Sequence, residues 1–185
     1  MLPQLYKDVE ARMKKAVEAT ALEFAAIRTG RANAALLDHV VVEAYGTEMP
    51  LRHVANVAVP DARSLVVSPH DKSILGDVRK ALEKSDLGIT PNVEGNAIRL
   101  ALPALTEERR KELVKLVHKR AEEGRIAVRN VRRDGHDHLK VAQKDSKVTE
   151  DEAHRANEQL QKITDKFVAD IDGLVQHKEK EIMEV

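Results

Sequence analysis

Arginine side chains are the residues of this sequence best suited to binding chemistry, and they gather in the segment Arg125-Ile-Ala-Val-Arg-Asn-Val-Arg-Arg133. A guanidinium group is always charged, and its planar N–H donors match two oxygens of a phosphate group. On a helix, Arg125, Arg129, Arg132 and Arg133 point about 100° away from the apolar band of the same segment. The helix can therefore pack through one side and present a multi-arginine surface to a polyanion.

An ordinary alternative for these arginines is a solvated helix face in which they pair with Glu122, Asp134 and Asp137. Two features favour RNA: the residues are arginines rather than lysines, and they outnumber the nearby acids. A second basic group, Arg109 and Arg110, begins the same predicted helix and is expected near Arg28 and Arg31. Only four aromatic residues are present, so recognition of phosphate and shape is favoured over stacking on exposed bases.

Other reactive groups form no convincing active site. The histidines of His136-Asp137-His138 are two residues apart and point in different directions on a helix, so only Asp134 and His138 share a face. A metal-assisted hydrolase built on that pair would lack a complete ligand set. The sequence has no cysteine and no phosphate-binding G-x-x-x-x-G-K-[ST] loop. We therefore expect a protein that is not an enzyme, with no catalytic residue, no metal and no cofactor.

Three long segments with helical period must position the arginines. The first contains Leu5, Val9, Met13, Phe24 and Ile27 at three- and four-residue steps and is predicted to stop at Thr29-Gly30. The second is predicted from an N-cap at Thr106 to about Lys144, with a possible bend at Gly135. The third is predicted to begin at Thr149, which forms a capping box with Glu152. Their narrow apolar stripes suit one another, which predicts an elongated three-helix bundle.

The residues between the first two helices have a different pattern. Short runs rich in β-branched residues are separated by Gly and Pro, and one helix is predicted over Asp71 to Ser85. The predicted strands are 40–43, 54–59, 64–68 and 97–102. An α+β chain is therefore expected, with residues 31–103 as a small α/β domain inserted into a bundle of residues 1–29 and 105–185. Two parallel linkers predict a hinge at Arg28, Thr29, Gly30 and Arg31 and at Pro103, Ala104 and Leu105.

The net charge of zero conceals a segregation of sign along the chain. Residues 125–144 contain six basic and two acidic residues, whereas residues 145–185 contain eleven acidic and six basic ones. A neutral protein can in this way direct one basic face toward phosphate. No apolar run approaches the length of a signal peptide or a membrane span, so we expect a cytoplasmic protein with no membrane partner.

Five motifs, in order and in register, resemble the bacterial ribosome recycling factor family. They span essentially the whole chain, and the resemblance is carried by Ile27-Arg-Thr-Gly-Arg-Ala-Asn33, Tyr45-Gly46, Ser85-Asp-Leu-Gly-Ile-Thr-Pro91, Leu105-Thr-Glu-Glu-Arg-Arg-Lys-Glu-Leu113 and Val128-Arg-Asn-Val-Arg-Arg133. The resemblance implies a three-helix bundle joined by a flexible double linker to a small α/β domain, in an L shape similar to transfer RNA.

The resemblance also implies a function at the end of protein synthesis. With elongation factor G and GTP, such a protein splits the post-termination ribosome into subunits while its bundle lies on large-subunit rRNA. It implies that Arg132 is the main rRNA-contacting arginine, supported by Arg129, Arg28 and Arg31. We add Arg125, Arg133, Arg109 and Arg110 as candidates and expect a monomer. The alternative function is a helical adaptor or chaperone that binds protein rather than RNA, with little dependence on salt.

Overall fold

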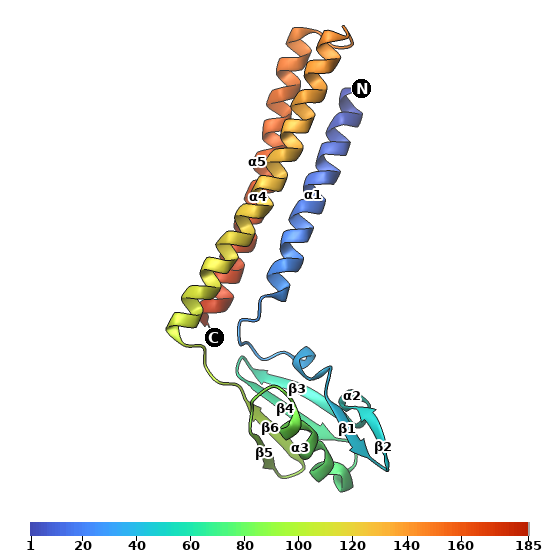
Figure 1. Ribbon diagram of the computed structural model, residues 1–185, viewed down its shortest axis with the longest axis vertical. Helices are drawn as coiled ribbons and strands as arrows, with labels where there is room; N and C mark the ends of the chain where they lie inside the picture. Colours follow the sequence, from blue (N-terminus) through green and yellow to red (C-terminus); the bar gives the residue numbers. More distant parts are fainter. Residues whose placement is uncertain (185) are drawn as a thin grey trace. The chain divides into compact units, whose positions relative to one another are not determined.

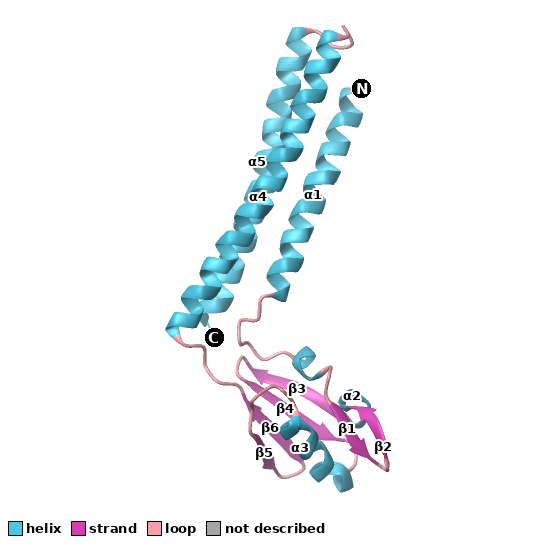
Figure 2. Ribbon diagram, viewed as in Figure 1, coloured by secondary structure: helices cyan, strands magenta, loops and turns pink. Residues whose placement is uncertain are grey.

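A computed structural model describes residues 1–184, which divide into two compact units. The first unit comprises Met1–Arg28 and Glu107–Glu184, and the second comprises Thr29–Thr106. The first unit is entirely helical, and the second holds every strand of the described chain (Figures 1 and 2). The chain is therefore of the α+β class, with the α/β unit inserted between two helices of the bundle.

Three long helices run side by side in the first unit: α1 (Leu2–Ala26), α4 (Glu107–Lys144) and α5 (Glu150–Glu184) (Figure 1). Each buries the stripe expected from its period, and the buried positions of α4 include Leu113, Val117, Val128 and Leu139. Helices of this length obtain most of their stability from such packing rather than from intrinsic propensity. The arginine segment therefore lies on a rigid element that is held from one side.

The predicted end of the first helix needs a correction. The helix stops at Ala26 rather than at Thr29-Gly30, because Ile27 adopts an extended conformation with φ −74° and ψ 112°. The Ile27 amide still donates to the Phe24 carbonyl, at 3.1 Å, and so closes the last turn. Two residues that the sequence placed in the helix, Ile27 and Arg28, thus belong to the exit of the chain from the bundle.

Gly135 does not interrupt α4, which is one continuous helix from Glu107 to Lys144. The glycine is buried, and a Cβ atom there would lie 3.1 Å from Cδ1 of Leu160 and 3.3 Å from Cγ2 of Val9. Its role is close packing against α5 and α1. The missing side chain lets three helices approach one another at this point of the unbroken helix.

The turn between α4 and α5 is fixed by the predicted capping box. The Glu152 carboxylate accepts from the Thr149 amide at 2.8 Å, and Thr149 Oγ1 accepts from the Glu152 amide at 3.2 Å. Val148 is buried beside Ala142 and Ala153, with Leu2 packed against them. These contacts tie the start of α1 to the α4–α5 turn and close that end of the bundle.

The second unit is built on an antiparallel four-stranded sheet with the order β3-β4-β6-β5. A separate hairpin pairs β1 with β2 and turns at Tyr45 and Gly46, which both have positive φ. The helix α3 packs against β1 and β5. Its buried residues, Val78 and Leu82, join the core formed with Leu65 and Ile98. The strands are β1 (Val41–Ala44), β2 (Thr47–Pro50), β3 (Ala55–Asp61), β4 (Ser64–Pro69), β5 (Pro91–Glu94) and β6 (Ala97–Ala101), and α3 spans Leu75–Lys84.

Several short elements of this unit were not predicted. They are β2, β5, the single-turn helix α2 (Leu51–Val54) and the 3₁₀ turn η1 (Ala34–Leu37), whereas a second 3₁₀ turn, η2 (Lys72–Ile74), begins the helix predicted over Asp71 to Ser85. None has more than four residues, and β5 begins with a proline at the sheet edge, where no ladder donor is needed. The strands β2 and β5 depend on pairing with β1 and β6 rather than on their own pattern. Within residues 1–184, no helix is long and apolar enough to cross a membrane.

Candidate nucleic-acid interface

The arginines of α4 differ in how much of each side chain is buried in the bundle. Arg129 and Arg133 are exposed, and Arg132 is half-buried. The side chain of Arg125 is only 19% exposed. The helix period accounts for the difference: Arg125 and Arg132 flank α5, whereas Arg129 and Arg133 point further outward. The arginines that the sequence predicts to form a single stripe therefore differ in their exposure to solvent.

Arg125 is a structural link between α4 and α5. Its Nε and Nη2 atoms donate to Oδ1 of Asp172 at 3.0 and 2.7 Å, and its Nη1 donates to Glu122 at 3.3 Å. The hydrogen bond to Asp172 is the main reason that the pKa of Arg125 lies above the ordinary arginine value. Most of the hydrogen-bonding capacity of this guanidinium is thus used inside the protein.

Arg129 and Arg132 make weaker connections. Arg129 Nη1 donates to Oε1 of Glu122 at 3.1 Å, in a pair whose side chains are 45% and 51% exposed. Arg132 Nη1 donates to the neutral amide oxygen of Gln161 at 3.3 Å. A contact with a neutral amide leaves the charge of Arg132 uncompensated. Such surface contacts are worth little and exchange easily with an incoming phosphate.

Arg133 is the most available member of the group. It is exposed, and it forms no ion pair with any residue in the described part of the chain. The outward face of α4 also includes exposed lysines at helical spacing from Arg133, and one exposed apolar residue, Ile126. The lysines are Lys115, Lys119, Lys140 and Lys144. Sequence reasoning did not assign Lys115, Lys119 or Ile126, although continuing the helical period from Arg133 in both directions would have reached them.

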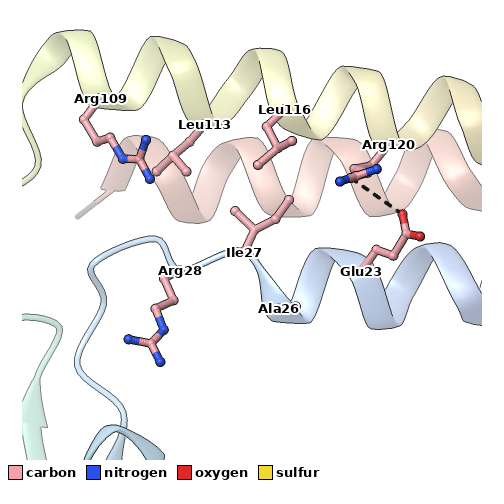
Figure 3. A pocket seen from close by; sticks show the side chains of 8 residues that line it. All are labelled: Glu23, Ala26, Ile27, Arg28, Arg109, Leu113, Leu116 and Arg120. Atoms are coloured by element: carbon pink, nitrogen blue, oxygen red, sulfur yellow. Dashed lines mark ion pairs between the residues drawn. The ribbon is translucent and has the colours of Figure 1, made fainter.

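Arg109 of the second basic group and Arg28 line a cavity of about 500 Å³ between the end of α1 and the start of α4 (Figure 3). Ile27, Leu113 and Leu116 point toward one another along it, and guanidinium groups lie at its edges. The eight lining residues are Glu23, Ala26, Ile27, Arg28, Arg109, Leu113, Leu116 and Arg120. Two candidate arginines of the sequence, Arg28 and Arg109, are thus brought together, and Arg120 joins them.

The charges around this cavity are largely balanced. Arg120 lies 3.1 Å from Glu123 and 3.9 Å from Glu23, and Arg109 lies 3.0 Å from Glu112. Arg110 does not line the cavity and is half-buried, and Arg31 is exposed in the second unit. The local positive charge is therefore smaller than at Arg132 and Arg133. We call the surface formed by Arg125, Arg129, Arg132 and Arg133 the arginine face of α4. It remains the stronger candidate for a polyanion-binding site.

The histidines and acids beside the arginine face are used in packing contacts. Asp134 pairs with Arg12 of α1 at 2.6 Å. His136 Nδ1 lies 2.9 Å from Oδ1 of Asn157, and His138 Nδ1 lies 3.2 Å from the backbone oxygen of Asp134. No group of three potential metal ligands occurs within residues 1–184. The contacts of Asp134 and His136 join α4 to α1 and α5, whereas that of His138 stays within α4.

Both linkers between the units are held by the turn that joins β3 to β4. The Ala32 amide donates to the Ala62 carbonyl, and the Leu102 amide donates to the Arg63 carbonyl, each at 2.8 Å. Ala32 and Leu102 are therefore tied to the sheet. Any flexing of the linker backbone must occur before Ala32 in the first linker and after Leu102 in the second. These two stretches contain the predicted hinge residues.

The two linkers also touch each other at Gly30. This glycine has φ +75°, and a Cβ atom there would lie 3.1 Å from the Leu105 side chain. Thr29 is buried, Leu105 is half-buried, and Pro103 and Ala104 are exposed. Glycine is thus needed at position 30 both for its backbone conformation and for the space beside Leu105.

Comparison with known proteins identifies the relatives of this arrangement. The family described as "Ribosome recycling factor" matches residues 20–183. Ribosome-recycling factors from Bacillus pumilus and Thermosynechococcus vestitus are 53% and 56% identical to this chain, over 100% and 96% of it and 100% and 98% of their own lengths. A solution structure of the ribosome recycling factor is 43% identical, with a TM-score of 0.66 over 100% of this chain and 98% of that one. A further structure gives models for the T. thermophilus ribosome recycling factor and the E. coli elongation factor G bound to the E. coli post-termination complex. It is 47% identical, with a TM-score of 0.61 over 98% of each chain.

Proposed function

Because this chain belongs to the ribosome recycling factor family, we propose that it works with elongation factor G and GTP to split post-termination ribosomes into subunits. A similar structure concerns a relative on a post-termination complex together with elongation factor G, which supports both partners. The chain would act as a monomeric translation factor in the cytoplasm. It would make and break no covalent bond itself.

The arginine face of α4 is the surface that we assign to the large-subunit rRNA. The observation that carries this assignment is the availability of Arg132 and Arg133, whose charges no acidic side chain within residues 1–184 neutralises by an ion pair. Charge-assisted hydrogen bonds to phosphate would anchor the bundle there. Arg129 would join them, Arg28, Arg109 and Arg110 would contribute from the end of α1 and the start of α4, and Arg31 would contribute from the second unit. Arg125 would support the surface mainly through its contact with Asp172.

Movement of the small unit about the linkers is the mechanical part of the proposal. The bundle is rigid because its three helices share one core, while only two short linkers connect it to the sheet. Pressure from elongation factor G on the second unit would displace it about 28–31 and 103–105. The free energy would come from the partner's GTP hydrolysis and from tighter binding to separated subunits than to the joined ribosome.

Light scattering of post-termination ribosomes tests the function directly. The protein, elongation factor G and GTP are supplied together, and each is then omitted in turn. We expect scattering to fall only when all three are present. If scattering does not fall with partners from a matching organism, the proposal that the protein splits ribosomes into subunits is wrong. Pelleting of ribosomes across a salt series then distinguishes an RNA-binding protein from a protein-binding adaptor, which would show little salt dependence.

Arg132→Ala tests the rRNA assignment. It should weaken ribosome binding by about tenfold or more, since charge-assisted bonds are worth about 1.5–3 kcal/mol. Its helicity and melting temperature should stay close to those of the wild type, because the hydrogen bond lost is a single one of 3.3 Å to the neutral amide of Gln161. A loss of folding would show instead that Arg132 is structural.

A disulfide between the linkers tests the hinge. One cysteine is placed in 28–31 and one in 103–105, in a chain that has no cysteine of its own. The oxidised protein should bind ribosomes but fail to split them, and reduction should restore splitting. Normal splitting by the oxidised protein would rule out movement at the linkers.

A further inference from the structure

Glu122 is an acid placed inside the arginine face. Its Oε1 accepts from Nη1 of Arg129 at 3.1 Å, and its Oε2 accepts from Nη1 of Arg125 at 3.3 Å. The carboxylate is about half exposed. A negative charge at this position opposes the approach of phosphate, and it also occupies a donor of Arg129. The arrangement lowers the affinity of the surface for RNA compared with a face of arginines alone.

The two arginines that share Glu122 are not equivalent. Arg125 is held independently by two hydrogen bonds to Asp172. Arg129 has Glu122 as its ion-pair partner within residues 1–184. If Arg129 turns to a phosphate, Glu122 keeps Arg125 as a cation beside it. Exchange at Arg129 therefore leaves no carboxylate without a partner, which makes it easier than breaking an isolated ion pair.

We propose that Glu122 is an electrostatic lock on Arg129, which holds the guanidinium in the free protein and yields it to an RNA phosphate on binding. This inference rests on the proposed function, because it assumes that the arginine face meets rRNA. A factor that serves many ribosomes must leave each one after the subunits separate. At that stage Glu122 would form its ion pair with Arg129 again and so speed dissociation. Differences in affinity at one interface lie mostly in the dissociation rate.

Glu122→Gln tests the lock, and Glu123→Gln is the matched control. Both substitutions remove one negative charge and preserve shape, but Glu123 pairs with Arg120 rather than with Arg129. Binding to ribosomes and the dissociation rate are measured for both variants at several salt concentrations. We expect Glu122→Gln to bind about three- to fivefold tighter, through slower dissociation, and Glu123→Gln to show no comparable gain.

A double-mutant cycle with Arg129→Ala isolates the residue through which Glu122 acts. In the Arg129→Ala background, Glu122→Gln should no longer tighten binding. An equal gain with and without Arg129 would show a general charge effect and overturn the lock, as would equal gains in Glu122→Gln and Glu123→Gln. If the wild type shows no salt-sensitive ribosome binding, the proposed rRNA contact itself is wrong, which is a separate result. Melting curves of each variant confirm that the comparison concerns folded protein.

Discussion

Arg125 on α4 and Asp172 on α5 are joined by two N–H groups that converge on a single carboxylate oxygen, at 3.0 and 2.7 Å. The arginine is mostly buried, whereas the carboxylate stays half exposed. The first residue of the most basic segment thus serves to hold two helices of the bundle together. The same segment supplies both a link between two helices and the surface that we assign to rRNA.

Substitution at Arg125 should therefore affect stability more than binding. Arg125→Ala is expected to lower the free energy of unfolding by about 1 kcal/mol, because it loses the Asp172 bonds and the packing of its aliphatic stem. Arg133→Ala, at an exposed position, should change stability by less than about 0.5 kcal/mol. Urea unfolding of both variants measures this difference, and equal effects would contradict the structural role of Arg125.

Gly124 packs closely against Thr20 of α1 and Ile171 of α5. A Cβ atom there would overlap Oγ1 of Thr20 and lie 3.3 Å from Cδ1 of Ile171. Gly124→Ala should therefore destabilise the bundle by about 1–3 kcal/mol, as overpacking of a core does. Thr20→Ala removes the overlapping oxygen, which donates only to the Ala16 carbonyl of its own helix. The double variant should recover part of the loss in thermal unfolding.

Gly173 provides the matched control for that substitution. It also lies within a long helix, but a Cβ atom there would meet nothing within 4 Å. Gly173→Ala should raise the free energy of unfolding by up to about 1 kcal/mol through helix propensity alone. Destabilisation by both alanine variants would show that contact with Thr20 is not the cause at Gly124.

The hairpin residue Tyr45 donates a hydrogen bond from its hydroxyl to Oδ2 of Asp71, at 2.6 Å. This bond is the main cause that raises the pKa of Tyr45 and lowers the pKa of Asp71. Asp71, with a depressed pKa, stabilises the fold above the ordinary carboxyl value of about 4 and loses that contribution as pH falls. Tyr45, with a raised pKa, stabilises the fold below about 10 and loses that contribution as pH rises.

The stability difference between wild type and Tyr45→Phe should therefore be largest between these limits and shrink on both sides. Chemical unfolding of the second unit at a series of pH values measures it. A direct check uses the Tyr6→Phe background, in which Tyr45 is the remaining tyrosine. Its absorbance titration should move to lower pH when Asp71→Asn is added. An unmoved titration would show that the hydrogen bond does not form in solution.

The bundle was predictable because long amphipathic helices carry their own signal. Val117, Val128 and Leu139 follow the helical period, and the Thr149 capping box marks a helix start within four residues. The strands β2 and β5 were missed because residues such as Thr47 and Pro91 become strand only through pairing with the adjacent strands β1 and β6. Local patterns of four residues cannot encode such pairing.

The candidate site was predictable in composition but not in availability. Helical period placed Arg125 beside Arg129 and Arg132, yet nothing local indicates that Asp172, 47 residues away, holds Arg125. In the same way, the sequence offered Glu122 as one of several neutralising acids, without showing that it contacts two arginines at once. Ion pairs across the bundle depend on how the helices pack, which the sequence pattern leaves open.

Ile126 is the apolar member of the outward face of α4, and its exposure of 48% is unusual beside so many charges. Arg129 and Arg133 lie three and seven residues on, so all three share one face. If rRNA covers this face, the side chain loses its contact with water, and Ile126→Ser should weaken binding by about fivefold at every salt concentration. Arg133→Ala should instead reduce the slope of log affinity against log salt by about 1. Val141→Ser, at a second exposed apolar site of α4, is the control. An equal loss of affinity in this variant would show that the effect is not specific to Ile126. Unchanged affinity of Ile126→Ser would place Ile126 in water in the complex and confine the interface to the side of α4 nearer Arg132.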